Sequence, residues 1–380
     1  MIHARTLLYV CTYDPDRADL GGGGWTDRRL LHLLRREYDV RVITVTGQPS
    51  SEEDPKLSFS NVPLTVRGSR IALGRTLCHM LLHQSPYLAS KFQTWGTAWR
   101  VGADRFRDHV QAFDVVVTNG WPALLLAAEA DVTPDLHVAQ NVESRIAAAH
   151  APRLLRIMSE ERRLAQLEEN LLGRPRVVAA IGASDVAYFN SRGIKAELLS
   201  LPLHDFTSPP VERPLTLGFI GTQTWPPNAQ GLATLMDDII PQVQRVESVR
   251  VVLAGRGTEA FRNRPGVVTA GFVENESSFF KEVDLQVVPR AGVVTGVSVK
   301  LLEGTEYGVQ AIASADLIEV HQGPTPWLAA DGVDEVLQRY AEFRENRRES
   351  ADRLRDYRSL IAAEVALKTV PRLRRLGVSD

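Results

Sequence analysis

Four residues between positions 296 and 303 have the types and spacing expected of an anion-binding site. Gly296 lies in a small-residue loop, Ser298 is a predicted helix N-cap, and Lys300 adds a positive charge in the first turn. The unpaired N–H groups and the dipole at a helix N-terminus favour a bound anion. Glu303 would lie about 7 Å beyond Ser298 along the helix axis, roughly the span from a diphosphate to the hydroxyl pair of its ribose. The spacing therefore predicts a nucleotide.

The stretch Pro289–Gly308 must position these residues, and its pattern predicts a strand, a loop and a helix. The apolar run Leu285–Val288 comes first, and the loop after it contains Gly292 and Gly296. Apolar residues then recur with helical spacing until Gly308, which is expected to act as the C-cap.

The whole chain alternates short apolar runs with helical segments, which is typical of α/β domains with parallel sheets. We predict two doubly wound, Rossmann-like domains, residues 1–203 and 204–359, joined through the proline-rich stretch Leu201–Pro214. A C-terminal helix over residues 360–380 is expected to pack back on the first domain. The predicted strands are Thr6–Cys11, Val40–Val45, Asp114–Thr118, Leu136–Ala139, Val177–Ile181, Thr216–Ile220, Val249–Leu253, Val267–Thr269, Leu285–Val288 and Gln310–Ser314.

Helical periodicity marks the segments between these strands. In the first domain we expect helices at Thr26–Arg36, Pro122–Ala130 and Arg153–Leu172. The charged segment Asp334–Leu376 is predicted to be helical, with one apolar face packed on the outside of the protein.

Three further loops follow strands of the second domain. Gly221 ends one strand, and Asn228 in the loop after it is expected to cap the next helix. Arg256 is flanked by two glycines in a second loop, and Val273 lies in a third. Doubly wound sheets bind ligands at the carboxyl ends of their strands, so we expect these loops to converge on one site beside a cleft between the domains.

A run of four glycines, Gly21–Gly24, follows the first strand of the first domain. Glycines tolerate positive φ and allow a ligand to approach the backbone closely, so this run is expected to form a ligand-binding loop. The alternative is a flexible surface loop, because glycines are also general loop residues.

Charge excludes several classes of partner. The 380 residues contain 44 Lys plus Arg and 46 Asp plus Glu, so the chain is close to neutral. No overall field attracts nucleic acid or a membrane surface. No window reaches the ~20 apolar residues of a membrane-spanning helix, so we expect at most peripheral membrane contact.

Cysteine usage indicates a reducing compartment. Cys11 and Cys78 are far apart and give neither a disulfide framework nor a metal-ligand spacing. The apolar run at the N-terminus is too short for a signal peptide and is followed by an acidic, glycine-rich segment. We therefore expect a cytoplasmic protein.

At this point the motifs resemble those of a known family. The chain is similar to GT-B-fold glycosyltransferases of the retaining family-4 group, which includes sucrose synthases and phosphatidylinositol mannosyltransferases. The resemblance covers nearly the whole chain and is more specific in its second half. The matching motifs, in chain order, are GGGGW, QNVES, GFIGTQTWPPN, LAGRG, GFV and TGVSVKLLE.

The resemblance assigns the second domain to a nucleoside-diphosphate sugar, such as a UDP-sugar. Glu303 matches the second Glu of the family's Glu-x7-Glu motif and would accept hydrogen bonds from the ribose hydroxyls. The backbone amides of Gly296, Val297 and Ser298 would meet the diphosphate, and Lys300 would neutralise the leaving group.

Other positions of the family's donor site also have counterparts. Val273 matches the position whose backbone reads the base. Gly23 and Gly24 match the loop that closes over the donor from the first domain. Arg256 or Arg290 would assist phosphate binding.

This chain differs from the family at two positions, one where the family has a glutamate and one where it has a histidine. The first Glu of Glu-x7-Glu is Thr295 here, and the family's catalytic-site His is Gln140. The Arg and Lys that many members carry in the loop after Gly221 fall near Thr222 and Asn228. The resemblance still permits catalysis, because in retaining chemistry the leaving phosphate can take the acceptor proton.

The resemblance implies transfer of a sugar to an acceptor hydroxyl or amine with retention of configuration, without a metal or other cofactor. The acceptor would be a small molecule, a natural product, or a glycan- or lipid-linked compound. Lys300, Gln140 and Glu143 are the catalytic candidates, although Glu143 has the alternative of being a surface carboxylate. The alternatives are a catalytically silent auxiliary protein and a sugar-nucleotide epimerase with the same fold.

Two other patterns have simpler explanations. His79 and His83 have the spacing of a metal-chelating pair, but no third ligand is nearby, so we expect packed or solvated histidines. The segment Ile71–Val110 mixes basic and aromatic residues, including Phe92, Trp95 and Trp99. This mixture would suit a lipid interface, although helices that face the core are the preferred interpretation.

Overall fold

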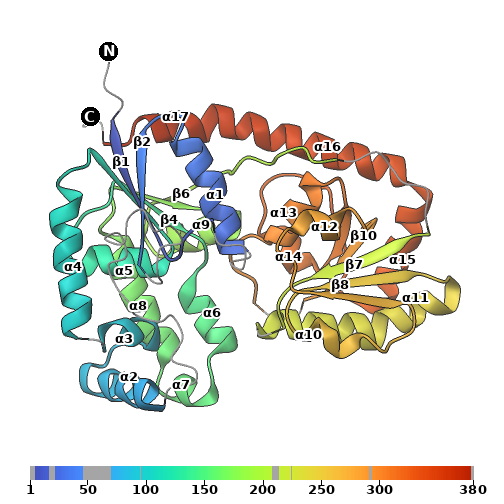
Figure 1. The fold of residues 1–380 in the computed structure, drawn as a ribbon, viewed down its shortest axis with the longest axis horizontal. Coiled ribbons are helices and arrows are strands. Elements are labelled where there is room, and N and C mark those ends of the chain that lie inside the picture. Colours follow the sequence, from blue (N-terminus) through green and yellow to red (C-terminus); the bar gives the residue numbers. More distant parts are fainter. Residues whose placement is uncertain are drawn as a thin grey trace. The chain divides into compact units, whose positions relative to one another are not determined.

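The computed structural model describes residues 5–16, 22–45, 70–94, 96–207, 214–223, 225–290 and 293–377 (Figure 1). The chain divides into two compact units. Unit 1 comprises Met1–Leu201 with Val365–Asp380, and unit 2 comprises Pro202–Glu364. The division thus lies next to the sequence-based boundary at 203/204, and the C-terminal segment grouped with unit 1 begins at Val365.

Unit 1 is built on a six-stranded parallel sheet with strand order β2-β1-β3-β4-β5-β6. The predicted strands all form, with shifts of one residue at some ends, and β6 is an addition. Strands β3 and β4 are buried along their whole length, and β1 and β5 are buried except at their first residue, which explains their largely apolar sequences. The strands are β1 (Thr6–Cys11), β2 (Asp39–Thr44), β3 (Val115–Asn119), β4 (Leu136–Ala139), β5 (Val177–Ala180) and β6 (Ala196–Leu198).

Helices supply the remaining apolar surface of unit 1. Helices α4, α5, α8 and α9 contribute to one buried cluster with strand residues such as Val116 and Val178. Helix α1 lies alongside β1 and β2 in Figure 1. The helices are α1 (Gly22–Leu34), α2 (Arg70–His83), α3 (Tyr87–Gln93), α4 (Thr97–Val110), α5 (Trp121–Glu129), α6 (Glu143–His150), α7 (Arg153–Ile157), α8 (Glu160–Leu172) and α9 (Ala183–Ser191).

The C-terminal segment of unit 1 is held by side-chain contacts to main-chain oxygens. Tyr38 donates its hydroxyl to the Leu373 carbonyl at 2.6 Å. Thr369 donates to the Ser200 carbonyl at 3.0 Å. The segment consists of η3 (Val365–Thr369) and α17 (Val370–Arg374).

Unit 2 has a second six-stranded parallel sheet, with strand order β12-β11-β10-β7-β8-β9. All five predicted strands of this domain form, and β12 is an addition. The strands are β7 (Thr216–Ile220), β8 (Arg250–Ala254), β9 (Val267–Gly271), β10 (Leu285–Val288), β11 (Gln310–Ala313) and β12 (Leu328–Ala329).

Helices cover both faces of the unit 2 sheet (Figure 1). One face packs against α10, α11 and α15 in a large buried cluster, and the other packs against α12. The apolar face predicted for the C-terminal helices is buried, as Val336, Tyr340 and Leu354 show. The elements are α10 (Pro226–Thr234), η1 (Leu235–Ile239), α11 (Ile240–Val246), η2 (Thr258–Phe261), α12 (Glu276–Phe280), α13 (Val299–Glu306), α14 (Ala315–Glu319), α15 (Val333–Glu345) and α16 (Arg347–Glu364).

Two secondary-structure predictions in unit 1 are wrong. The glycine run was expected to be a loop, but Gly23 and Gly24 lie in the first turn of α1, while Gly21 falls outside the described residues. The single helix expected over Arg153–Leu172 is two helices, α7 and α8. Ser159 separates them in a left-handed conformation with φ 57°, which no helix can continue.

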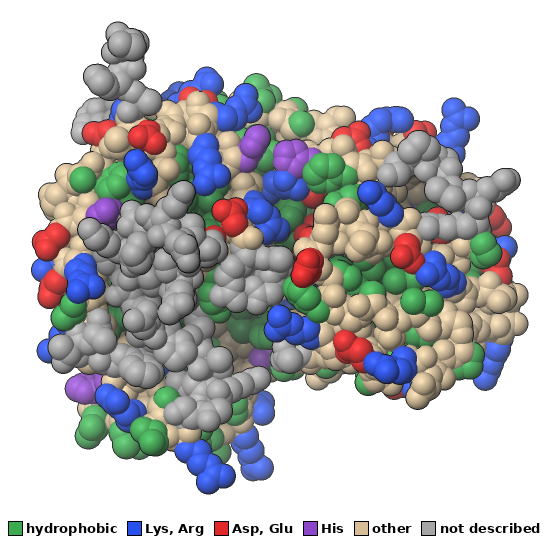
Figure 2. Space-filling view, in the orientation of Figure 1, with side chains coloured by type: hydrophobic (Ala, Val, Ile, Leu, Met, Phe, Trp, Pro, Cys, Tyr) green, Lys and Arg blue, Asp and Glu red, His purple; other side chains and the backbone are tan. Residues whose placement is uncertain are grey.

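The described part of the chain contains no helix long and apolar enough to cross a membrane. Figure 2 shows Lys, Arg, Asp and Glu side chains interspersed on the visible face of each unit. This mixture agrees with the near-neutral composition and gives no single-sign patch for nucleic acid on that face.

Helix α10 approaches the carboxyl end of β10 closely, and one glycine makes this possible. A Cβ placed on Gly231 would lie 2.2 Å from the carbonyl oxygen of Pro289. Because that oxygen belongs to the main chain, the contact cannot be relieved by a rotamer change. The small residue therefore fixes the distance between α10 and the loop after β10.

We predict that Gly231→Ala lowers the free energy of unfolding by ~2–3 kcal/mol because of this overlap. Gly74→Ala in α2 is the matched control, since nothing lies within 4 Å of its added Cβ. The control should stabilise the protein by ~1 kcal/mol through helix propensity. Urea denaturation measures both changes, and a neutral Gly231→Ala variant would contradict the packing argument.

Candidate active site

The strand order of unit 2 locates a candidate site. The order reverses between β7 and β10, which are neighbours in the sheet although far apart in sequence. In doubly wound sheets ligands bind outside the carboxyl ends of the strands at such a reversal. The loops that begin here are Gly221–Gln223 after β7 and Pro289–Ser298 after β10.

Lys300 connects the helices that follow these two loops, α13 and α10. It lies in the first turn of α13, and its Nζ donates to Asn228 Oδ1 at 2.7 Å. The same nitrogen lies 5.8 Å from the centre of the Phe219 ring. A Cβ on Gly221 would lie only 3.0 Å from Lys300 Cε, so glycine leaves the space that the lysine occupies. The predicted members Gly221, Asn228 and Lys300 are thus brought together.

The ammonium group of Lys300 is poorly solvated. The pKa of Lys300 is lowered from 10.5 to about 8, chiefly by burial and to a lesser extent by the positive charge of Arg290, while the charge of Glu303 acts in the opposite direction. A cation kept in such surroundings interacts strongly with an anionic ligand, because little water screens it.

Arg290 adds a second, part-buried cation to the loop after β10. Its main chain is fixed by Ser314, whose Oγ accepts from Arg290 N at 2.7 Å and donates to Arg290 O at 2.8 Å. Burial lowers the pKa of its guanidinium. Its Nε is buried and has no hydrogen-bond partner within the described ranges. Two neighbouring cations with one donor unused favour a ligand that carries more than one negative charge.

The small-residue turn before α13 adopts the conformation that an anion site requires. Gly296 has φ 69°, in the region that favours glycine, and Thr295 is 8 % exposed. Ser298 occupies the N-cap position, as predicted, but its side chain makes no capping bond. Its backbone N–H donates to His321 Nε2 at 3.2 Å. That amide is therefore already used, which corrects the prediction that it meets a diphosphate.

Glu303 lies one turn into α13 and is 9 % exposed. The helix ends where the sequence predicted, with Gly308 at φ 74° just beyond it. The amides of Gly308 and Val309 donate back to Thr305 and Gly304, which completes the helix terminus.

Arg256 and Val273 lie on the neighbouring loops of the same sheet edge. The Arg256 carbonyl accepts from Gln223 N at 2.9 Å, which ties the loop after β8 to the loop after β7. The Arg256 guanidinium carbon lies 5.0 Å from the ring centre of Phe272, which is 42 % exposed. Val273 is part-buried against the cluster that includes Phe280. Phe272 thus presents an aromatic surface beside the predicted base-reading residue.

Asn228 does not cap a helix, which corrects the prediction. Helix α10 begins at Pro226 after the N-cap residue Trp225, so Asn228 lies inside the first turn. Its Nδ2 donates to the Thr222 carbonyl at 3.0 Å while its Oδ1 accepts from Lys300. The side chain therefore orients the lysine and Thr222. Gly292 lies outside the described residues.

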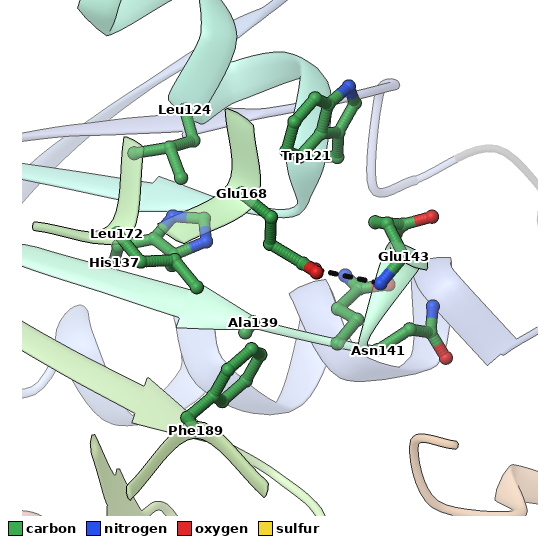
Figure 3. Close-up of a pocket in the computed structure, with 10 residues that line it drawn as sticks. Trp121, Leu124, His137, Ala139, Asn141, Glu143, Glu168, Leu172 and Phe189 are labelled. Atoms are coloured by element: carbon green, nitrogen blue, oxygen red, sulfur yellow. Dashed lines mark hydrogen bonds between the residues drawn. The ribbon is translucent and has the colours of Figure 1, made fainter. Parts of the chain in front are cut away.

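Unit 1 contains a pocket that includes Gln140 and Glu143 (Figure 3). Its cavity is small, about 10 Å³, which is room for a single water molecule. Figure 3 shows Glu168 reaching toward the main chain of Glu143. The lining residues are Trp121, Leu124, His137, Ala139, Gln140, Asn141, Glu143, Glu168, Leu172 and Phe189.

Glu168 fixes the beginning of α6 at this pocket. Its Oε1 accepts from Glu143 N at 2.8 Å, and its Oε2 accepts from the Ser144 hydroxyl at 2.6 Å. The pKa of Glu143 is raised to about 7, chiefly by burial and then by the charge of Glu168, while the charge of Lys91 acts in the opposite direction. Glu143 is part-buried at this pocket, and its catalytic role stays a prediction.

The glycine run lies next to the pocket residue that replaces the family's histidine. A Cβ on Gly23 would be 3.7 Å from Gln140 Oε1. Farther along α1, Asp27 accepts from both Tyr9 and Asn119 at 2.6 Å, which holds the helix on β1 and β3. Gly23 therefore lies beside Gln140, in a helix rather than in the loop that was predicted.

Two further patterns of the first domain lie in helices α2, α3 and α4. His79 and His83 have ring centres 4.4 Å apart, and His79 Nδ1 contacts Ser90 Oγ at 3.2 Å. No group of three potential metal ligands exists among the described residues. Phe92 and Trp99 are buried in the core, as the preferred interpretation held, and Trp95 falls outside the described residues.

Sequence reasoning missed three supporting residues. Glu168 shares a helical face with Leu164, Leu171 and Leu172, so a carboxylate within an apolar stripe was the available signal. Phe272 stood between two residues of a motif that had already been singled out. His321 gave no local signal, because only the folding of the chain brings it to Ser298.

Most of unit 2 matches a known protein family. Residues 214–346, which lie in unit 2, match the family of glycosyl transferases group 1. No match was found among curated protein sequences. Unit 2 therefore carries a glycosyltransferase group 1 domain.

Solved structures extend the likeness over the whole chain. Sucrose-phosphate synthase from Thermosynechococcus elongatus is 14 % identical, with a TM-score of 0.68 over 98 % of this chain and 99 % of that chain. HepE from Anabaena, solved with UDP and glucose, is 12 % identical, with a TM-score of 0.56 over 98 % and 97 % of the two chains. WaaG, a glycosyltransferase involved in lipopolysaccharide biosynthesis, is 14 % identical, with a TM-score of 0.53 over 98 % and 97 %.

These comparisons confirm the resemblance to GT-B-fold glycosyltransferases and the predicted fold class. At these identities the solved structures show the fold alone. Membership of the retaining group stays a prediction.

We predict that Lys300→Met raises the free energy of unfolding at pH 7 by ~1–2 kcal/mol, because it removes a desolvated cation next to Arg290. The wild-type pKa of Lys300 is lower in the folded than in the unfolded chain, so its destabilising effect is complete below pH 8 and decreases as the pH rises toward 10.5. The difference between variant and wild type should therefore shrink above pH 8.

Urea denaturation at pH 7 and pH 9.5 measures this effect. Exposed Lys195 provides the control, and Lys195→Met should change stability by less than ~0.5 kcal/mol. A Lys300→Met variant that is less stable than wild type at pH 7 would show that the lysine is well compensated in the folded protein.

Proposed function

Starting from the glycosyltransferase group 1 domain at residues 214–346, we propose that the protein transfers a sugar from a nucleoside-diphosphate sugar to an acceptor hydroxyl or amine, with retention of configuration. The donor is held by unit 2, and unit 1 supplies acceptor-binding groups. A cytoplasmic location is part of this proposal.

One observation carries the proposal: two desolvated cations, Lys300 and Arg290, lie in the loop and helix that follow β10. The leaving diphosphate gains negative charge as the glycosidic bond breaks. Fixed positive groups in a poorly solvated site stabilise such charge without reorganisation. We propose that Lys300 and Arg290 perform this role without a metal ion.

The rest of the donor fits around these cations. Glu303, one turn beyond Lys300 on the same helix, would accept the ribose hydroxyls. Phe272 and the backbone of Val273 would contact the base. We propose a UDP-sugar as the donor, which is supported by the solved structure of HepE with UDP and glucose.

The proposed reaction needs no protein base. The bond between the anomeric carbon and the phosphate oxygen breaks, and the acceptor oxygen or nitrogen forms the new bond on the same face. The acceptor proton moves to the departing phosphate oxygen. The protein's contribution is to position the acceptor and to stabilise the diphosphate.

Gln140 and Glu143 are the proposed acceptor-positioning residues of unit 1. Gln140 offers a neutral amide that can donate and accept hydrogen bonds. Because the pKa of Glu143 is about 7, its carboxyl can be neutral or charged near neutral pH. The proposed acceptors are small molecules, natural products, and glycan- or lipid-linked compounds.

A second candidate function is a catalytically silent protein that only binds the nucleotide sugar. It is favoured by Thr295, which is buried where the family carries a carboxylate, and by Gln140 in place of the histidine. A sugar-nucleotide epimerase of the same fold is a further alternative.

A panel of nucleotide sugars, incubated with and without acceptors, separates these functions. The proposed transferase releases a nucleoside diphosphate, and acceptors accelerate this release. Binding without turnover across the panel would support the silent protein, whereas an isomerised sugar nucleotide formed without acceptor would support the epimerase. Thermal-shift measurements with uridine, guanosine, thymidine and adenosine diphosphates identify the base.

We predict that Glu303→Ala weakens nucleoside-diphosphate binding by about 1.5–3 kcal/mol, because charge-assisted hydrogen bonds to the ribose are lost. Titration calorimetry with UDP measures the change. The control is Glu319→Ala at an exposed position of α14, which should leave affinity unaltered. Equal affinity of the Glu303→Ala variant and wild type would remove this residue from the site.

A further inference from the structure

His321 contacts the anion-binding turn although no motif includes it. It follows α14 and is 7 % exposed. Its Nε2 accepts the backbone N–H of Ser298 at 3.2 Å, and its ring packs edge-on against Trp327 with ring centres 4.5 Å apart. The imidazole therefore has one polar contact and one aromatic contact, and the two can be separated experimentally.

The geometry fixes the chemical form of the imidazole. A backbone N–H can only donate, so Nε2 must be unprotonated to accept it. Burial lowers the pKa of His321 to about 3, which keeps the ring neutral. The acceptor thus persists across the physiological range of pH.

This bond decides which amides the helix start offers to a ligand. Leu301 and Leu302 donate to the Ser298 carbonyl, and the Ser298 amide donates to His321. The amides of Val299 and Lys300 precede the first main-chain bonds of the helix. They share the first turn with the Lys300 ammonium group, so the turn presents a defined set of donors.

His321 is itself held by contacts that return to α13. Trp327 Nε1 donates to Thr305 Oγ1 at 3.1 Å, and Thr305 Oγ1 donates to the Leu301 carbonyl at 2.8 Å. The chain of contacts from Ser298 through His321, Trp327 and Thr305 therefore begins and ends on the same helix. Such a closed arrangement restricts the orientation of the turn relative to the helix.

We propose that His321 is a positioning residue for the diphosphate of the donor. It fixes the turn at Ser298 so that the first amides of α13 and Lys300 point to one anion. The inference rests on the proposed function, because it assumes that a nucleoside diphosphate binds at this turn.

Two substitutions separate the hydrogen bond from the packing. His321→Gln retains an acceptor but loses the ring, whereas His321→Phe retains a ring against Trp327 but loses the acceptor. The inference predicts that His321→Phe weakens UDP binding ~5- to 20-fold by calorimetry, whereas His321→Gln stays within ~3-fold of wild type. A role in packing alone predicts the reverse order.

A third variant removes the donor instead of the acceptor. Ser298 has φ −80°, which proline can adopt, so Ser298→Pro deletes the N–H and leaves His321 in place. It should weaken UDP binding as His321→Phe does. This variant keeps the test decisive if a His321 variant fails to fold, as judged by its melting temperature.

The possible results distinguish a failure of the positioning role of His321 from a failure of the proposed function. If wild-type protein binds UDP and both His321→Phe and Ser298→Pro bind it equally well, the positioning role is wrong and the proposed function stands. If wild-type protein binds no nucleoside diphosphate, the proposed function fails and the positioning role fails with it.

Discussion

The desolvated charge of Lys300 is the constraint around which the carboxyl edge of unit 2 is arranged. Folding places this ammonium group beside Arg290, so two like charges share poorly hydrated surroundings. Gly221 provides the space for the side chain, and Asn228 accepts its hydrogen bond. A residue that weakens the folded state but is held in a defined position is typical of a site built for a ligand.

Helix α13 carries Lys300 and Glu303, and contacts at both ends fix it. His321 holds the turn at its beginning. At its end, the Glu306 carboxylate accepts from His204 N at 2.8 Å, and the Thr305 carbonyl accepts from Arg358 at 2.7 Å. A helix restrained in this way keeps a phosphate-binding group and a ribose-binding group at a constant separation, which favours a ligand of matching length.

Much of the fold was predictable because parallel strands leave a strong pattern. Runs such as Thr6–Cys11 and Leu285–Val288 are almost wholly buried and therefore mostly apolar, although Gln286 is a buried polar exception. The end of helix α13 was predictable because Gly308 determines it locally, and Ser298 marks its beginning although its side chain makes no capping bond. Glycines gave a weaker signal: Gly23 and Gly24 lie in the first turn of a helix, although glycine is more typical of loops.

Features that depend on tertiary contacts could not be read from the sequence. Asn228 was expected to cap a helix, but Lys300 and Thr222 compete for its side chain from distant positions. The break at Ser159 and the contact of His321 with Ser298 likewise have no local pattern. The motifs predicted Lys300 and Glu303 as members of the site, whereas the contacts of His321 and Asn228 were seen only in the structure.

The central claim is that an anionic donor group meets the Lys300 ammonium, and proton uptake on binding tests it most directly. UDP can be titrated calorimetrically in two buffers with different ionisation enthalpies. At pH 8 the phosphates of UDP no longer titrate, so they do not contribute to proton uptake. Because the pKa of Lys300 in the protein without ligand is about 8, about half of the Lys300 side chains are unprotonated at pH 8. Binding of UDP should therefore lead Lys300 to take up about half a proton per molecule. Lys300→Arg, which stays charged, should take up none. Absence of uptake in the wild type, or equal uptake in the Arg variant, would contradict the claim.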